Sequence, residues 1–137
     1  MCIRDRFYSP ITNNGLLEFK GGCNDYAGIT NNNRLVFSSP TTITVYGVIS
    51  GTGYINVWSP TVFQAVNTYT GATYIQSTLT LAGNASIADS YYVGISPGDS
   101  LIYAESAGFT ETEANQQLAG AGTIVDDSCL LYTSRCV

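Results

Sequence analysis

A nine-residue unit occurs twice near the start of the chain, and it restricts the possible folds more than any other feature of the sequence. Ile11–Phe19 reads ITNNGLLEF and Ile29–Phe37 reads ITNNNRLVF, so six of the nine positions are identical. Repetition at a fixed short spacing is typical of solenoids, whose units bury their apolar faces by stacking on one another. The distance in sequence from Ile11 to Ile29 is too short for a helical repeat, but it can hold two or three short strands with their corners.

The residue types within the unit indicate stacked parallel strands joined by sharp corners. The Asn-Asn-Gly and Asn-Asn-Asn triplets tolerate the positive φ angles that such corners require. Leu17 and Phe19 are separated by a single residue, so both side chains point to one face of a strand. In a stack we expect Leu17 over Leu35, Phe19 over Phe37, and the corner asparagines in a ladder of amide hydrogen bonds. An antiparallel meander would not require the same corner residues in the same phase.

Short strand-like runs continue through the rest of the chain, separated by turns that contain glycine or proline. We expect strands at Thr42–Ile49, Tyr54–Trp58, Thr61–Thr68, Thr73–Leu81, Ser90–Ile95 and Asp99–Ala104. Only Thr110–Gln117 suggests a helical turn, because Thr110 and Glu113 fit a capping box. No convincing amphipathic stretch follows it. The sequence therefore predicts an all-β fold.

The charge and composition exclude several classes of function. The chain has 5 Lys and Arg residues against 10 Asp and Glu residues, so it carries no basic footprint for nucleic acid. It contains no histidine, which excludes a His-based catalytic triad and removes a main zinc ligand. No run approaches the ~18 apolar residues of a membrane-spanning helix.

The two ends of the chain differ in composition from its interior. Residues 1–6 and 129–137 hold three of the four cysteines and three of the five cationic residues. Both ends resemble translated sequencing adapters, which occur on reading frames from metagenomic assemblies, and such scars are set aside before fold reasoning. We expect residues 7–128 to form a single β-helical repeat region from a longer protein, with non-native ends. The alternative is a genuine N-terminal arm and a C-terminal disulfide pair, which would favour a compact β-sandwich.

The segment Val48–Asp89 resembles the autotransporter-associated β-strand repeat of bacterial passenger domains. The motifs of that family occur here in order, as GVISGTG at Gly47–Gly53, NTYTGAT at Asn67–Thr73, TLTLAG at Thr78–Gly83 and ASIA at Ala85–Ala88. Leu118–Val125 (LAGAGTIV) looks like the opening of the next block. The sequence departs from the family pattern at Trp58–Val66, which predicts an irregular rung there.

This resemblance implies a right-handed parallel β-helix that is exported through the outer membrane and displayed on, or shed from, a bacterial surface. With every rung as long as the first, residues 7–128 would hold about six or seven coils. We expect a non-catalytic structural or adhesive module without a cofactor, a monomer that contacts surface glycans or host and abiotic surfaces and precedes a translocator barrel. A phage tail-fibre or tailspike segment, which would be an obligate trimer, and the β-helical scaffold of a polysaccharide-processing enzyme are the alternatives.

The sequence offers little for catalysis or metal binding. Glycoside hydrolysis needs two carboxylates about 5–9.5 Å apart, and only Glu111 with Glu113 and Asp126 with Asp127 are close in sequence. The other interior acids are Glu18, Asp25, Asp89, Asp99 and Glu105. Cys23 has no histidine to activate it. Gly21–Asp25 is the nearest approach to a calcium-binding repeat, but it occurs once and is interpreted as a turn. We therefore predict no catalytic, cofactor-binding or metal-binding residue.

The aromatic residues are the remaining candidates for ligand contact. They form a possible sugar-stacking strip on one face of the solenoid: Tyr46, Tyr54, Trp58, Tyr69, Tyr74, Tyr91, Tyr92 and Tyr103. Core packing and outward-facing strand propensity are the interpretation that we favour for most of them.

Overall fold

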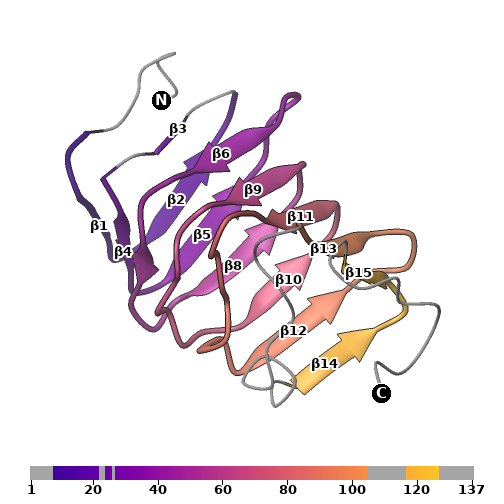
Figure 1. The fold of residues 1–137 in the computed structure, drawn as a ribbon. Coiled ribbons are helices and arrows are strands. Elements are labelled where there is room, and N and C mark those ends of the chain that lie inside the picture. The colour runs from indigo at the N-terminus through magenta and orange to yellow at the C-terminus, as the bar shows by residue number, and fades with distance from the viewer. Residues whose placement is uncertain (1–7, 22–23, 26, 105–116, 127–137) are drawn as a thin grey trace.

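The chain folds as a parallel β-solenoid of about five turns, as the computed structural model shows (Figure 1). The structure describes residues 8–21, 24–25, 27–104 and 117–126, and it places no helix among them. Every pairing between these strands is parallel. The predicted β-helix is confirmed. The expected six or seven coils are too many, because several rungs are longer than the repeat at the start of the chain.

The strands form three sheets that run along the solenoid. Sheet 1 contains, in order, β1 (Ile11–Asn13), β4 (Ile29–Asn31) and β7 (Ile49–Ser50). Sheet 2 contains β2 (Leu16–Phe19), β5 (Arg34–Phe37), β8 (Tyr54–Val57), β10 (Thr73–Ile75), β12 (Tyr92–Ile95) and β14 (Gln117–Gly120). Sheet 3 contains β3 (Asn24–Asp25), β6 (Ile43–Val45), β9 (Thr61–Phe63), β11 (Thr78–Leu81), β13 (Ser100–Tyr103) and β15 (Thr123–Asp126).

The repeat in the sequence is a repeat in space. Leu17 pairs with Leu35 and Phe19 with Phe37, as predicted, and the two phenylalanine rings stack with their centroids 5.5 Å apart. The next rung is longer than the first, since Leu35 pairs in turn with Ile55. The corners absorb the difference, because residues 38–42 join β5 to β6 whereas residues 76–77 alone join β10 to β11. The strands therefore stay in register although the rungs differ in length.

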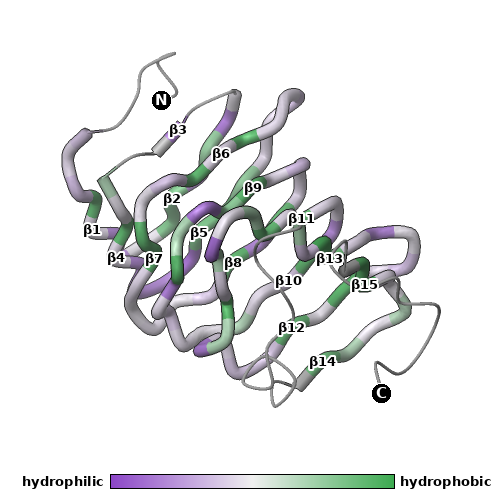
Figure 2. The backbone as a smooth tube through the Cα atoms, in the orientation of Figure 1, coloured by the Kyte–Doolittle hydropathy of each residue, from purple (hydrophilic) through white to green (hydrophobic). Residues whose placement is uncertain are grey.

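The core is the interior column of the solenoid (Figure 2). Each described rung contributes side chains from its strands, because alternate residues of a strand point inward. Phe37 also packs edge-on against Phe63 of sheet 3, with 5.7 Å between the ring centroids. Burying such a side chain fully stabilises the fold by roughly 1.5–3 kcal/mol. Since each inward residue packs against those of the rungs above and below, the stability of the stack is a sum over neighbours.

The predicted ladder of corner asparagines is present between sheets 1 and 2. Inside the corner, Asn13 donates a hydrogen bond from Nδ2 to Oδ1 of Asn31, 2.8 Å away. Outside it, Asn32 donates from Nδ2 to Oδ1 of Asn14 at 2.9 Å. The ladder ends at the next rung. Thr30 pairs with Ser50, so Gly51 occupies the position that is equivalent to Asn31. Gly51 has a φ of +98°, and a Cβ there would overlap the carbonyl oxygen of Asn31.

Three of the predicted strands are too long. Thr73–Leu81 is two strands of different sheets, β10 and β11, which a corner at Gln76 and Ser77 separates. Thr42–Ile49 likewise turns from sheet 3 into sheet 1, and Thr61–Thr68 is a strand only to Phe63. Neither glycine nor proline marks the corner at Gln76 and Ser77, so the apolar alternation continues through it.

Two further expectations concern the middle and the end of the chain. The rung at Trp58–Val66 is regular, because Thr61 of β9 pairs in register with Ile43 on one side and Leu79 on the other. The expected helical turn at Thr110–Gln117 lies outside the described residues except for Gln117, which begins strand β14. The terminal segments 1–6 and 129–137 also lie outside the described residues.

Candidate functional site

The outward side of sheet 2 carries a group of exposed or half-buried aromatic residues, which we call the aromatic face: Tyr54, Trp58, Tyr74, Tyr91 and Tyr92. Tyr54, Tyr74 and Tyr92 lie on three adjacent strands, β8, β10 and β12. Strand alternation points them outward, because their neighbours Ile55, Thr73 and Val93 fill the core. The exposed fractions of Tyr54, Trp58, Tyr74 and Tyr91 are 37%, 44%, 40% and 65%.

The tyrosine rings of this face contact one another in a zigzag across the strands. Tyr74 is the register partner of Gly94, which follows Tyr92 on the same side of β12. The Tyr74 side chain therefore lies diagonally between those of Tyr54 and Tyr92. The ring centroids are 6.3 Å apart for Tyr54 and Tyr74, and 5.8 Å apart for Tyr74 and Tyr92. Tyr91 extends the row, with its centroid 6.5 Å from that of Tyr92. These spacings lie in the range of favourable aromatic pairs, so the rings hold each other in place.

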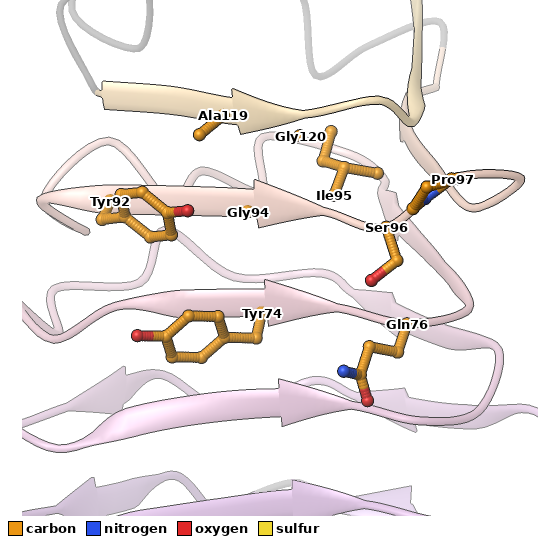
Figure 3. Close-up of a pocket in the computed structure, with 9 residues that line it drawn as sticks. All are labelled: Tyr74, Gln76, Tyr92, Gly94, Ile95, Ser96, Pro97, Ala119 and Gly120. Atoms are coloured by element: carbon orange, nitrogen blue, oxygen red, sulfur yellow. The ribbon is translucent and has the colours of Figure 1, made fainter.

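A shallow hollow of about 280 Å³ opens beside the tyrosines (Figure 3). Tyr74 and Tyr92 form one side of it, and the polar side chains of Gln76 and Ser96 lie opposite. Gly94 forms the floor between them, and the floor continues to its register partner on β14, Ala119. The remaining lining residues are Ile95, Pro97 and Gly120. All of the described lining residues are uncharged.

Gly94 determines how the Tyr92 ring lies. A Cβ atom at Gly94 would come within 2.9 Å of Cε1 of Tyr92 and 3.2 Å of its hydroxyl oxygen. The Tyr92 ring therefore leans along its own strand over Gly94, in space that any other residue would fill. The glycine thus sets both the depth of the hollow and the position of its aromatic wall.

Arg34 and Trp58 form a second contact on the same face. The guanidinium carbon of Arg34 lies 5.2 Å from the centroid of the Trp58 ring, within the range of a cation–π interaction. Val36 follows Arg34 on the outward side of β5, and its register partner Asn56 precedes Trp58 on the same side of β8. Both Val36 and Asn56 point outward, yet they are only 1% and 8% exposed. The Arg34–Trp58 pair therefore covers an apolar position on the outside of the solenoid.

The structure separates the eight candidate aromatic residues into three groups. Five of them form the aromatic face defined above. Tyr69 and Tyr103 are fully buried in the core. Tyr46 is 38% exposed but lines a different hollow of about 440 Å³ beside sheet 1, with Val48 and Gly28 among its neighbours. Core packing therefore explains Tyr69 and Tyr103, and outward-facing strand positions explain Tyr54, Tyr74 and Tyr92. Gln76, Gly94 and Ser96 carry no chemical motif in the sequence, although each shares strand parity with an outward tyrosine.

Tyr69 makes a buried hydroxyl cluster in the core. Its hydroxyl oxygen lies 2.7 Å from Oγ1 of Thr73, which is 3.0 Å from Oγ of Ser90. Ser90 donates onward to the carbonyl oxygen of Gly71 at 2.8 Å. Desolvation raises the pKa of the Tyr69 phenol well above its usual value, and the hydrogen bonds to Thr73 and Ser90 offset this in part.

None of the candidate acids that the structure describes lines the hollow, although Glu18 lies on the outward side of sheet 2 as the register partner of Val36. Glu18 forms an ion pair with Lys20, with 3.2 Å between Nζ and Oε2. Asp25 and Asp126 lie on β3 and β15 of sheet 3, whereas Asp89 and Asp99 lie in the connections that precede β12 and β13. Outside the described residues lie Cys23, Glu105, Glu111, Glu113 and Asp127. The part of the chain that the structure describes contains no cluster of three or more His, Cys, Asp or Glu side chains.

Comparisons with protein-family models, curated proteins and solved structures return no match to this chain. None of the described residues forms a helix long and apolar enough to cross a membrane. The fold and the face together define a parallel β-solenoid with an uncharged aromatic hollow on its outer surface.

Proposed function

We propose that this chain is a non-catalytic structural and adhesive module of a bacterial protein that is exported and displayed at the cell surface. The in-register stacking of like side chains supports the structural part of the proposal. Leu17, Leu35 and Ile55 occupy one continuous column, and equivalent columns run through the other sheets. Such a stack gives a rod whose length grows with each rung. The order of the motifs in Val48–Asp89, which resembles autotransporter passenger repeats, supports the location.

The outer surface supports the adhesive part of the proposal. Isolated apolar residues on a surface are ordinary, but a contiguous group is typical of an interaction site. The aromatic face is such a group, and it spans the three adjacent strands β8, β10 and β12. Repeated along a longer solenoid, weak contacts of this kind add up to strong attachment through effective concentration.

The first test is the genomic reading frame around this sequence. Long reads across the locus are expected to show the frame running through further rungs into a C-terminal run of alternating strands that forms a translocator barrel. A frame that lies among virion structural genes would contradict the proposal in favour of a phage fibre. A frame with a catalytic domain would contradict it in favour of an enzyme.

The oligomeric state of the purified full-length chain provides a second test. A passenger module is expected to be a monomer by light scattering coupled to size exclusion. A phage fibre segment would be an obligate trimer, so a stable trimer would overturn the proposal.

A further inference from the structure

We infer that the hollow on the aromatic face is a binding site for an uncharged glycan, with one pyranose ring seated between the Tyr92 ring and the side chains of Gln76 and Ser96. This inference names the class of ligand that the proposed adhesive module would bind, and it rests on that proposed function. The argument depends on the size of the hollow, its chemistry and the way Gly94 positions the tyrosine.

The size of the hollow suits one sugar ring. Small-molecule sites usually enclose about 300–1,000 Å³, and this hollow of about 280 Å³ is slightly smaller than that range, as a site for a single ring would be. It is a shallow depression on the outside of the sheet, bounded by Tyr74 and Gln76 of one rung and Tyr92 and Ser96 of the next. Among the described residues the hollow is open to solvent, so a glycan chain can continue beyond a ring that is seated there.

The chemistry of the hollow matches the two kinds of surface that a sugar presents. The apolar C–H face of a pyranose carries slight positive charge and is attracted to the negative face of an aromatic ring, which Tyr92 and Tyr74 provide. The hydroxyls at the ring edge need hydrogen-bonding partners, which the Gln76 amide and the Ser96 hydroxyl provide on the opposite side. Neither of these two side chains hydrogen-bonds to another residue within the described part of the chain.

The charge of the hollow favours an uncharged ligand. None of the described residues that line it carries a charge, and the chain as a whole carries a formal charge of −5. Lys20 and Arg34 are the only cations in the described part of the sequence, and both already have contacts, with Glu18 and Trp58 respectively. An anionic polysaccharide would therefore find no free cation there and a repulsive overall charge.

The row of tyrosines indicates the direction of the glycan. Tyr54, Tyr74 and Tyr92 follow one another across adjacent strands, which is the direction of the solenoid axis. A glycan that lies along this axis reaches several rings at once, so longer oligosaccharides bind more tightly than short ones.

The binding test uses the full-length chain and isothermal titration calorimetry with cellohexaose, mannohexaose and chitohexaose as neutral probes. At least one of them is expected to bind saturably with a dissociation constant of about 1 mM or lower. The matching disaccharide is expected to bind more weakly, and hexagalacturonate, an anionic probe, is expected not to bind. The inference is overturned if none of the neutral hexasaccharides binds to the folded protein, or if hexagalacturonate binds equally well.

Variants assign the binding to the hollow. Tyr74→Ala and Tyr92→Ala are each expected to weaken binding at least about tenfold, a loss typical of one stacked ring. Tyr46→Ala is the matched control, because Tyr46 has a similar exposed fraction and lies beside sheet 1. It is expected to bind as the wild type does. An equal loss in Tyr46→Ala would overturn the assignment.

A further variant separates ring position from ring identity. Gly94→Ala retains both tyrosines but fills the space under the Tyr92 ring, which must move because it is the flexible partner. Binding is expected to fall while the melting temperature changes little. If the chain is instead a dimer that the tyrosine variants dissociate, the aromatic face is an interface between two copies of the chain and the glycan inference is wrong. A failure to bind glycans would not contradict the proposed surface location, because the genomic reading frame tests that location separately.

Discussion

The side-chain amides of Asn13 and Asn31 lie one rung apart and are joined by a hydrogen bond of 2.8 Å. The same Nδ2 of Asn13 also donates to the backbone carbonyl of Arg34, where β5 begins. One rung on, Nδ2 of Asn31 donates at 3.1 Å to the carbonyl of Tyr54, where β8 begins. Each buried amide therefore ties a corner to the first residue of the sheet 2 strand in the next rung. The ladder is a structural device that sets the register of the corner.

Replacing Asn31 is expected to destabilise the protein by about 1–3 kcal/mol, because Asn13 loses its acceptor and the carbonyl of Tyr54 loses its donor inside the fold. Asn31→Ala is compared with Asn32→Ala, because the side-chain hydrogen bond from Asn32 to Asn14 is exposed to water. The control is expected to change the free energy of unfolding by less than about 0.5 kcal/mol. Urea denaturation measures the free energy of unfolding of both variants. An equal decrease in the two would show that the buried ladder stabilises the fold no more than the exposed one does.

The close approach of corners at Gly71 gives a second prediction. A Cβ atom at Gly71 would overlap the backbone carbonyl oxygen of Gly53, one rung below, and neither backbone can move without shifting its rung. Gly71→Ala is therefore expected to cost about 1–3 kcal/mol, as overpacking does. Gly15→Ala is the control, because nothing lies within 4 Å of the added Cβ. Thermal unfolding is expected to show a lowered melting temperature for the first variant only.

Alkaline pH is expected to destabilise the protein through Tyr69. Burial raises the pKa of this phenol in the folded state, whereas the unfolded chain ionises near 10. Above that pH the unfolded state binds fewer protons than the folded state, so the free energy of unfolding decreases as pH rises. The stabilisation is fully present below about pH 10 and is lost above it.

Urea midpoints at pH 8 and pH 11 test this dependence. Tyr69→Phe is expected to be less stable at pH 8, because a hydrogen bond to Thr73 is lost, and less sensitive to the change in pH. Tyr74→Phe, at an exposed ring, is expected to show the wild-type dependence on pH. If Tyr69→Phe and the wild type lose the same stability between the two pH values, Tyr69 is not the group responsible.

The stacking and the register could be predicted from the sequence because they depend on repeated residues. Two copies of ITNN…L.F place Leu17 on Leu35 and Asn13 on Asn31, and both pairs are present in the structure. The number of rungs could not be predicted in the same way. The corners between sheets 2 and 3 vary in length, and the corner at Gln76 and Ser77 carries no turn residue.

The aromatic residues show a second limit of sequence reasoning. Tyr74 and Tyr92 lie within strands, where alternation with buried neighbours points them outward. Tyr69 lies in a corner, where no such alternation applies, and it is fully buried. Composition alone therefore could not separate a surface ring from a core ring. Gly94 carries no chemical signal of its own, and only the position of the Tyr92 ring shows why a glycine is needed there.

The contact between Arg34 and Trp58 can be followed directly, because Trp58 is the only tryptophan in the chain. Arg34→Ala removes the group over the ring and uncovers Val36, so the fluorescence emission of Trp58 is expected to shift to longer wavelength. Stability is expected to fall by about 0.5–1 kcal/mol, the usual strength of an exposed cation–π contact.

Arg34→Met separates the two roles of the arginine, because it retains an apolar chain over Val36 while losing the charge. It is expected to shift the emission less than Arg34→Ala does. Lys20→Ala removes the other cation of the described residues, which pairs with Glu18, and is expected to leave the emission of Trp58 unchanged. An unchanged emission maximum in Arg34→Ala would show that the guanidinium does not cover the ring in solution, and that Val36 is shielded by other groups.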